Sequence, residues 1–273
     1  MSTIWPFQAT KINRFESLSY GASRNDIQQY LQQDIAEASL LTVSGLVKVL
    51  AQRKPGNQMK GIREGATLHC EMALWAKGYT RVAGLDEAGR GAWAGPVVAA
   101  AVILPADHLA CAPLLGAVRD SKQLTPKQRE RLFLAIREIA LGVGVGIVPA
   151  SIIDQIGIVP ATRQAMGQAL EALSLPPEHL LIDALRLPRV PLPQQVLTHG
   201  DAISLSIAAA SIIAKVTRDR ILIELDSQYP GYGFAQHKGY GTALHRMALA
   251  QLGPCSEHRG SFWPMRNRRG EDG

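Results

Sequence analysis

The fold is decided by the stretch Leu85-Asp86-Glu87-Ala88-Gly89-Arg90-Gly91-Ala92-Trp93-Ala94-Gly95-Pro96, which joins two apolar segments. The segments, residues 81–86 and 96–104, are predicted to be strands, because both are apolar and the second is rich in valine. Residues 87–95 are too few for a crossover helix, so the strands should pair as an antiparallel hairpin. An unpaired charge at a strand end costs on the order of several kcal/mol. The carboxylates there therefore indicate a ligand or a metal.

Helices and strands alternate downstream of this hairpin. Thr125, Pro126 and Gln128 form a capping box, which predicts a helix start. The strand predicted at 141–148 alternates Val or Ile with Gly, so another element should approach it closely. The full set is a helix from 126 to about 140, strand 141–148, a helix over 160–173, strand 180–183, an extended surface loop at 185–195, a buried helix over 202–225 and a helix near 242–252. This alternation predicts an α/β fold.

The chain divides into three regions by composition. Residues 1–78 carry helical patterns at about 23–38, 44–53 and 64–77 and no chemical motif, so they are predicted to be a small helical N-terminal extension. A partner- or substrate-binding module is the alternative for this region. Residues 79–265 are predicted to be the main α/β domain, with a helical C-terminal part, and residues 266–273 a disordered basic tail.

The charge balance favours an anionic partner. The chain has 29 Lys and Arg against 23 Asp and Glu, a formal net charge of +6, and nucleic acid is the first candidate. Three widely spaced cysteines indicate neither a disulfide framework nor a zinc site. The start of the chain lacks a signal-peptide pattern, and the longest uncharged apolar stretch, residues 202–214, is too short to span a bilayer. We therefore expect a cytoplasmic protein without membrane contact.

Four carboxylates share one context, because each follows or precedes an apolar segment: Asp86, Glu87, Asp183 and Asp201. Such junctions are where α/β proteins build their sites. Neighbouring carboxylates repel one another and need cations, and oxygen ligands select hard divalent ions such as Mg²⁺ or Mn²⁺. Separate surface acids or helix caps remain the alternative.

The glycine loop between the two strands is similar to a dinucleotide-binding fingerprint. That fingerprint must open a helix, whereas Pro96 opens a strand here, so we reject it. The loop at Gly89, Arg90 and Gly91 offers accessible backbone amides and one guanidinium, which suit contact with phosphate or ribose. A tight hairpin that needs glycine for its backbone angles is the alternative.

These segments together resemble the signature blocks of bacterial ribonuclease HII, a type 2 ribonuclease H. The blocks are Gly84-Leu85-Asp86-Glu87-Ala88-Gly89-Arg90-Gly91, Asp120-Ser121-Lys122, the run 200–220 from Gly200-Asp201 to Arg218-Asp219-Arg220, Phe234-Ala235-Gln236-His237-Lys238-Gly239-Tyr240 and His258-Arg259-Gly260-Ser261-Phe262. The resemblance covers about residues 79–265. It implies a ribonuclease H-like mixed β-sheet flanked by helices.

The resemblance also implies a chemistry. It makes Asp86, Glu87, Asp183 and Asp201 the catalytic, metal-binding carboxylates of a two-metal mechanism with Mg²⁺ or Mn²⁺. The substrates it implies are RNA–DNA hybrids and duplex DNA with single ribonucleotides, cleaved 5′ to the ribonucleotide to leave a 3′-hydroxyl and a 5′-phosphate. The residues expected to contact substrate are Gly89, Arg90 and Gly91 at the ribose, Tyr240 at the RNA–DNA junction, and Lys122, Lys215 and Lys238 at phosphates.

One residue departs from the family pattern, and two other functions remain open. The third acid is often followed by glycine in this family, whereas this chain has Ala184. Ribonuclease HIII is the nearest alternative. That family is expected to carry a Gly-Lys-Gly pattern where this chain has Arg90, and a strand-rich N-terminal extension where this chain shows helical patterns. A non-catalytic nucleic-acid-binding module with a structural metal is the alternative from another class.

Overall fold

The computed structural model describes residues 65–115, 117–118 and 124–268. The helical patterns predicted at 23–38 and 44–53 lie outside these residues, as do Lys122 and the last five residues. The strands are β1 (Val82–Ala88), β2 (Val97–Ile103), β3 (Gly142–Val148), β4 (His179–Asp183) and β5 (Gln194–Leu197). The helices are α4 (His69–Trp75), α5 (His108–Cys111), α6 (Pro126–Ile139), α7 (Ala150–Ile156), α8 (Ile158–Glu171), the 3₁₀ turn η2 (Gly200–Ala202), α9 (Leu205–Gln228), α10 (Phe234–His237), α11 (Ala243–Leu252) and α12 (Met265–Arg268).

The five strands form one mixed sheet in the order β3-β2-β1-β4-β5. Strands β1 and β2 pair antiparallel, with Asp86 opposite Ala100, so the predicted opening hairpin is confirmed. Strand β3 extends the antiparallel part, whereas β4 and β5 run parallel to β1 and to each other. The predicted α/β fold with a mixed sheet is thereby confirmed.

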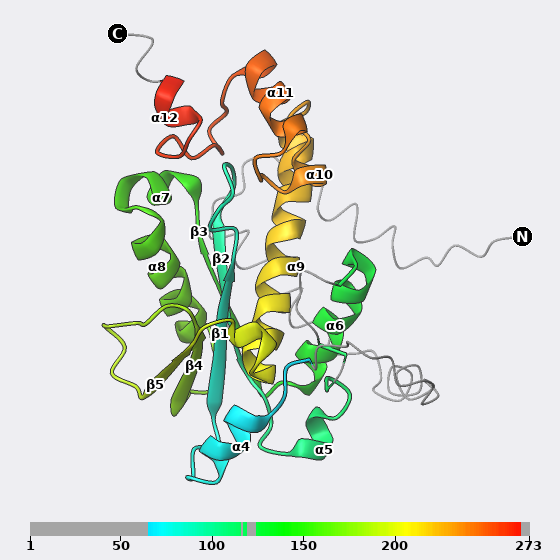
Figure 1. Cartoon of the computed structure of the whole chain (residues 1–273), viewed down its shortest axis with the longest axis vertical. Helices are drawn as coiled ribbons and strands as arrows, with labels where there is room; N and C mark the ends of the chain where they lie inside the picture. Colours follow the sequence, from blue (N-terminus) through cyan, green and yellow to red (C-terminus); the bar gives the residue numbers. More distant parts are fainter. Residues whose placement is uncertain (1–64, 116, 119–123, 269–273) are drawn as a thin grey trace, which may run out of the picture. The chain divides into compact units, whose positions relative to one another are not determined.

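Helices α8 and α9 cover opposite faces of this sheet (Figure 1). Side chains alternate along β1. Ala83 and Leu85 join the apolar core that α8 closes through Met166. Gly84 points the other way, because a Cβ there would lie 2.1 Å from the carbonyl carbon of Ser206 in α9. The glycine permits this close packing, and α9 therefore runs directly over β1.

Local signals predicted most helix starts and strands correctly. The capping box at Thr125 is present: its side chain accepts from the backbone N–H of Gln128, and the Gln128 side chain accepts from the backbone N–H of Thr125. On β3, a Cβ at Gly146 would lie 1.9 Å from the carbonyl oxygen of Ala165. The alternating glycines therefore admit helix α8, as the sequence predicted.

Three predictions need correction. The helix predicted at about 64–77 is shorter, because α4 begins at His69 and ends at Trp75. The loop at 185–195 is only partly an extended surface segment: Leu185 and Leu187 are buried, and its last two residues begin the edge strand β5. The helix predicted from residue 202 begins at Leu205, because Ser204 caps it by accepting from the backbone N–H of Ile207. The residues before this cap form the separate turn η2, which carries Asp201.

Candidate active site

Asp86 and Asp183 lie side by side at the ends of β1 and β4, and Asp201 follows the residue that is bonded to Asp183. Leu85 pairs with Ile182 in the parallel ladder, so Asp86 and Asp183 follow at the same level on neighbouring strands. The Asp183 carboxylate accepts a hydrogen bond of 2.9 Å from the backbone N–H of Gly200. Asp201 is the next residue and is buried. The turn η2 therefore brings Asp201 to the strand ends.

Glu87 lies beside this group but on the other face of the sheet. Strand β1 continues to Ala88, so strand alternation sends Glu87 to the face that α8 covers and Asp86 to the face that α9 covers. One oxygen of Glu87, Oε1, pairs with the Arg90 guanidinium at 3.0 Å. The other, Oε2, is buried and has no hydrogen-bond partner among the described residues. Glu87 thus keeps one carboxylate oxygen available.

Burial and neighbouring carboxylates disfavour the ionised forms of Asp86 and Glu87. Burial raises the pKa of Asp86 well above its ordinary value, and the negative charge of Glu87 raises it further, against a hydrogen bond from Ser211 that lowers it. Burial also raises the pKa of Glu87, although the hydrogen bond and the charge of Arg90 oppose this. Because the ionised carboxylates destabilise one another, a cation bound here would be stabilised.

The donor set suits a hard divalent ion, because it offers carboxylate oxygens and one of them is unpartnered. Within the described residues, however, no group of three or more His, Cys, Asp or Glu is arranged so that it could hold a metal. The side chains are engaged otherwise: Glu87 is paired with Arg90, and Asp183 accepts from Gly200. Ligation by these acids would therefore require their side chains to reorient toward the ion.

The glycine loop uses its glycines for two different reasons. Gly89 has φ +93°, and a Cβ there would lie 2.0 Å from the Nε atom of the Arg218 side chain, so both backbone and space require glycine. Gly91 is exposed, and a Cβ there would meet no atom within 4 Å. Gly89 therefore maintains the loop, whereas Gly91 leaves its backbone accessible to a ligand.

Two buried arginines anchor this loop, and sequence reasoning did not assign them a role. Arg218 donates to the carbonyl oxygens of Pro96, Ala94 and Lys238 at 2.8–3.0 Å. Arg259 donates to the carbonyl oxygens of Gly95 and Arg90. Both arginines are 0% exposed. Both lie inside the sequence blocks that resemble the family, which could have indicated a role, but the sequence does not show that they bind backbone.

Tyr240 lies next to the glycine loop. The carbonyl oxygen of Gly239 accepts from the backbone N–H groups of Trp93 and Ala94, at 2.8 and 3.3 Å. Tyr240 is 36% exposed, with the Arg218 guanidinium 5.3 Å from the centroid of its ring. The predicted ribose-contacting loop and the predicted junction-sensing tyrosine are thus joined by backbone hydrogen bonds, and the ring faces solvent in part.

A chain of buried histidines holds the backbone of Tyr240. Since the Cys255 N–H donates to Nδ1 of His258, the ring proton of His258 lies on Nε2 and is donated to Nε2 of His245, 3.0 Å away. His245 must then carry its proton on Nδ1, which donates to the Tyr240 carbonyl at 3.0 Å. Each ring is therefore neutral, and the segment after α11 is linked to Tyr240.

This arrangement predicts a loss of stability in mild acid. Burial lowers the pKa values of His245 and His258 to about 4, below the value of about 6.5 in an unfolded chain. The stability that these two neutral histidines contribute is complete above pH 6.5. It is lost as pH falls toward 4, because the unfolded chain then binds more protons than the folded protein. The temperature of thermal unfolding, measured from pH 7.5 to 4.5, should fall more steeply for the wild type than for His258→Gln, because the variant takes up about one proton fewer when it unfolds. Parallel pH profiles would contradict this account.

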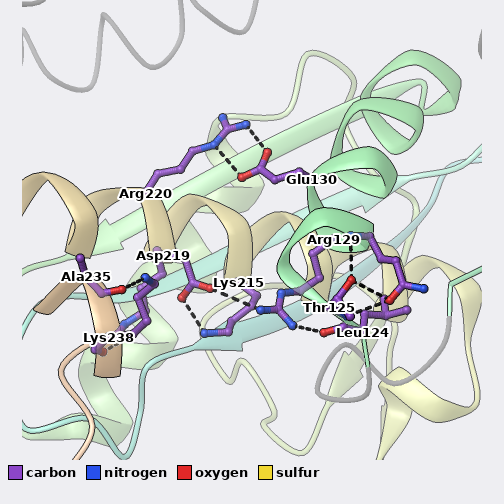
Figure 2. Close-up of polar contacts among 11 residues, drawn as sticks. Leu124, Thr125, Arg129, Glu130, Lys215, Asp219, Arg220, Ala235 and Lys238 are labelled. Atoms are coloured by element: carbon purple, nitrogen blue, oxygen red, sulfur yellow. Dashed lines mark hydrogen bonds and ion pairs between the residues drawn. The ribbon is translucent and has the colours of Figure 1, made fainter. Parts of the chain in front are cut away.

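A pocket of about 460 Å³ adjoins Tyr240 between α6, α9 and α10. Figure 2 shows two of its basic side chains paired with Asp219, which binds Lys215 at 2.6 Å and lies 3.8 Å from Arg129. Lys238 donates to the carbonyl oxygen of Ala235. Burial lowers the pKa values of Lys215 and Lys238. The structure thus places two of the three predicted phosphate-binding lysines in one pocket, and the third, Lys122, lies outside the described residues.

Known proteins are similar to this chain in fold and in sequence. The solved structure of ribonuclease H2 from Pyrococcus horikoshii OT3 matches with a TM-score of 0.60 and 28% identity over 70% of this chain and 98% of that one. Ribonuclease HII of Chloroflexus aurantiacus is 59% identical over 198 residues, 72% of this chain and 93% of the relative. Ribonuclease HII of Geobacillus thermodenitrificans is 50% identical over 242 residues, 89% and 90% of the two chains. The family model of ribonuclease HII matches residues 83–264.

The fold and the similarity to a solved ribonuclease H2 define the class as a ribonuclease H-like nuclease. Within that class, the chain belongs to the ribonuclease HII family. It is accordingly a ribonuclease H enzyme, an endonuclease, and the resemblance indicated by the sequence is confirmed over residues 83–264. Among the helices that the structure describes, none is both long and apolar enough to cross a membrane.

Proposed function

We propose that this protein cleaves the RNA strand of RNA–DNA hybrids, and duplex DNA 5′ to single embedded ribonucleotides, with Mg²⁺ or Mn²⁺ as cofactor. The observation that carries the proposal is the set of partly buried carboxylates at the ends of β1 and β4, where Glu87 keeps an unpartnered oxygen. This set lies one loop away from the accessible backbone of Gly91. A charge-rich site beside a backbone that can approach a ribose suits a nuclease that recognises ribonucleotides.

Asp86, Glu87, Asp183 and Asp201 are the residues that would hold the cations. When bound, divalent ions supply charge neutralisation at the scissile phosphate, a water of lowered pKa and stabilisation of the departing 3′ oxygen. Gly200 orients Asp183 through its N–H, and Ser211 orients Asp86 from α9. Arg90 is 3.0 Å from Glu87 and can exchange that contact for a substrate phosphate.

Substrate selection would rest on the loop and the tyrosine together. A 2′-hydroxyl distinguishes RNA from DNA at a given position, and amides of Gly89 to Gly91 can approach it because no side chain stands at Gly91. Tyr240 would stack on the neighbouring deoxyribose, where a second 2′-hydroxyl would clash. Lys215 and Lys238 are suited to backbone phosphates, which position the duplex without reading its sequence.

The decisive experiment uses a DNA duplex with one ribonucleotide, incubated with Mg²⁺, with Mn²⁺ and with EDTA. We expect one cut on the 5′ side of the ribonucleotide with either metal, products bearing a 3′-hydroxyl and a 5′-phosphate, and no cut with EDTA. An all-DNA duplex is the control and should stay intact. Binding that needs no metal and leads to no cleavage would instead support a nucleic-acid-binding module.

Replacing Tyr240 by alanine should impair the two substrates unequally. Loss of a stacking ring costs about 1–3 kcal/mol, so cleavage at a single embedded ribonucleotide should fall by about 5–150-fold, and cleavage of a long hybrid should fall less. Tyr240→Phe is the matched control, because it keeps the ring and should retain the wild-type ratio of kcat/KM on the two substrates. Equal losses on both substrates would contradict junction sensing by Tyr240.

A further inference from the structure

The segment 66–75 precedes the matched family region and is bound to the start of helix α9. Ala66 and Leu68 are buried. The backbone N–H of Thr67 donates to the carbonyl oxygen of Ile203 at 3.1 Å, and its carbonyl oxygen accepts from Leu205 at 2.9 Å. This short parallel bridge lies immediately after the turn η2, which carries Asp201.

Helix α4 places a buried carboxylate at the same point. Glu71 is 1% exposed, and its Oε1 atom accepts from the Ser204 hydroxyl at 2.6 Å, the Ser206 hydroxyl at 2.7 Å and the Ser206 N–H at 2.9 Å. Ser204 is also the N-cap of α9. The negative charge thus lies at the positive end of a 24-residue helix, where it is stabilised.

Stability alone does not account for this carboxylate. Its second oxygen, Oε2, is buried and has no hydrogen-bond partner among the described residues. Burying a charge with an unsatisfied acceptor costs free energy, and apolar replacements of buried ionic groups are often neutral or stabilising. The Glu71 carboxylate therefore indicates that the residues at the start of α9 must be held in one defined geometry.

Two contacts connect this geometry to the predicted metal-binding residues. The backbone N–H of Ser204 donates to the Gly200 carbonyl at 2.8 Å and closes the turn that carries Asp201. Ser206 packs against Gly84, two residues before Asp86 and on the same face of β1. Glu71 bonds both serines, so it fixes the residues that set Asp201 and Asp86 relative to each other.

We infer that Glu71 is a positioning residue for the metal site, acting through Ser204 and Ser206 to hold Asp201 and Asp86 in register. The inference rests on the proposed function, because it assumes that these acids bind divalent ions. It also gives part of the predicted N-terminal extension a role in the site: residues 66–75 brace the turn from outside the matched family region.

The test compares full-length wild type, Glu71→Ala and Glu71→Gln, with Glu171→Gln as a control that removes an exposed charge from α8. Mn²⁺ affinity is measured by calorimetry without substrate, and hydrogen–deuterium exchange is followed over residues 199–207. Loss of a residue that orients metal ligands costs at least about tenfold in affinity. We expect that weakening in Glu71→Ala, together with faster exchange over 199–207, a smaller effect in Glu71→Gln and none in the control.

A purely stabilising role gives a different result. Glu71→Ala would then have a lower unfolding temperature, but its folded form would bind Mn²⁺ with wild-type affinity, and this outcome overturns the inference. If the alanine variant does not fold, Glu71→Gln replaces it in the test: wild-type Mn²⁺ affinity and wild-type hydrogen–deuterium exchange in that variant would also overturn the inference. Failure of the wild type to cleave the ribonucleotide-containing duplex counts against the proposed function, whereas the exchange measurement still tests the bracing by Glu71.

Discussion

Asp86→Asn is expected to abolish cleavage of the ribonucleotide-containing duplex while the protein stays folded. Changes that only orient metal ligands cost about 10–100-fold, so loss of a proposed ligand should exceed a hundredfold in single-turnover rate. The fold should survive because asparagine retains an oxygen for the N–H of Glu87, which lies 2.7 Å from the Asp86 carboxylate. Removing this charge also removes the burial cost and the repulsion from Glu87 that together raise the pKa of Asp86.

The unfolding temperature without metal should therefore equal or exceed that of the wild type. Glu171→Gln removes an acidic group from the exposed surface of α8 and should leave both rate and stability unchanged. Comparable turnover by Asp86→Asn and wild type would refute the role of Asp86 in binding metal. A variant that is inactive because it is unfolded would show a lowered transition in circular dichroism, which the prediction excludes.

Arg218→Met should cause the largest loss of stability among the variants considered. The arginine satisfies three backbone carbonyl oxygens, at Ala94, Pro96 and Lys238, and each bond contributes about 1 kcal/mol. Methionine fills part of the volume but donates no hydrogen bond. The free energy of unfolding in urea should fall by on the order of 3 kcal/mol, and cleavage at single ribonucleotides should fall because the loop and Tyr240 lose their common anchor.

Arg220→Met is the matched control, two residues further along the same helix. Arg220 pairs with Glu130 at 2.7 Å, and both side chains are exposed by more than two fifths (Figure 2). Surface pairs contribute up to about 1 kcal/mol, so this variant should remain close to the wild type. Equal destabilisation by the two substitutions would show that the buried carbonyl contacts of Arg218 do not anchor the loop.

The parts of the fold that follow local rules could be predicted from the sequence. The hairpin follows from a loop too short for a crossover, and the start of α6 follows from the capping box at Thr125. The glycines of β3 indicated close packing because a strand otherwise disfavours them. Each of these signals lies within a few residues of the feature that it predicts.

The parts that depend on distant residues could not be predicted. Strand β5 begins with Gln194 and Gln195, which favour no strand, and it forms because β4 offers a parallel edge. The reason why glycine often follows the third acid in this family becomes clear only in the structure. Ala184, which stands at that position here, has a φ of +55°. This left-handed conformation favours glycine and costs about 1–2 kcal/mol in other residues. The contacts of Glu71 and Arg218 likewise join segments more than a hundred residues apart.

The arginine anchors also bear on how related enzymes can diverge. Arg259 holds residue 90 by its main-chain carbonyl, and Arg218 and Arg259 hold residues 94–96 in the same way. A main-chain oxygen is common to every amino acid, so the anchoring does not depend on which side chain position 90 carries. Exchange of Arg90 for the lysine of a Gly-Lys-Gly pattern should therefore leave the backbone of the loop unchanged, so that the proposed recognition of substrate could change at this position alone.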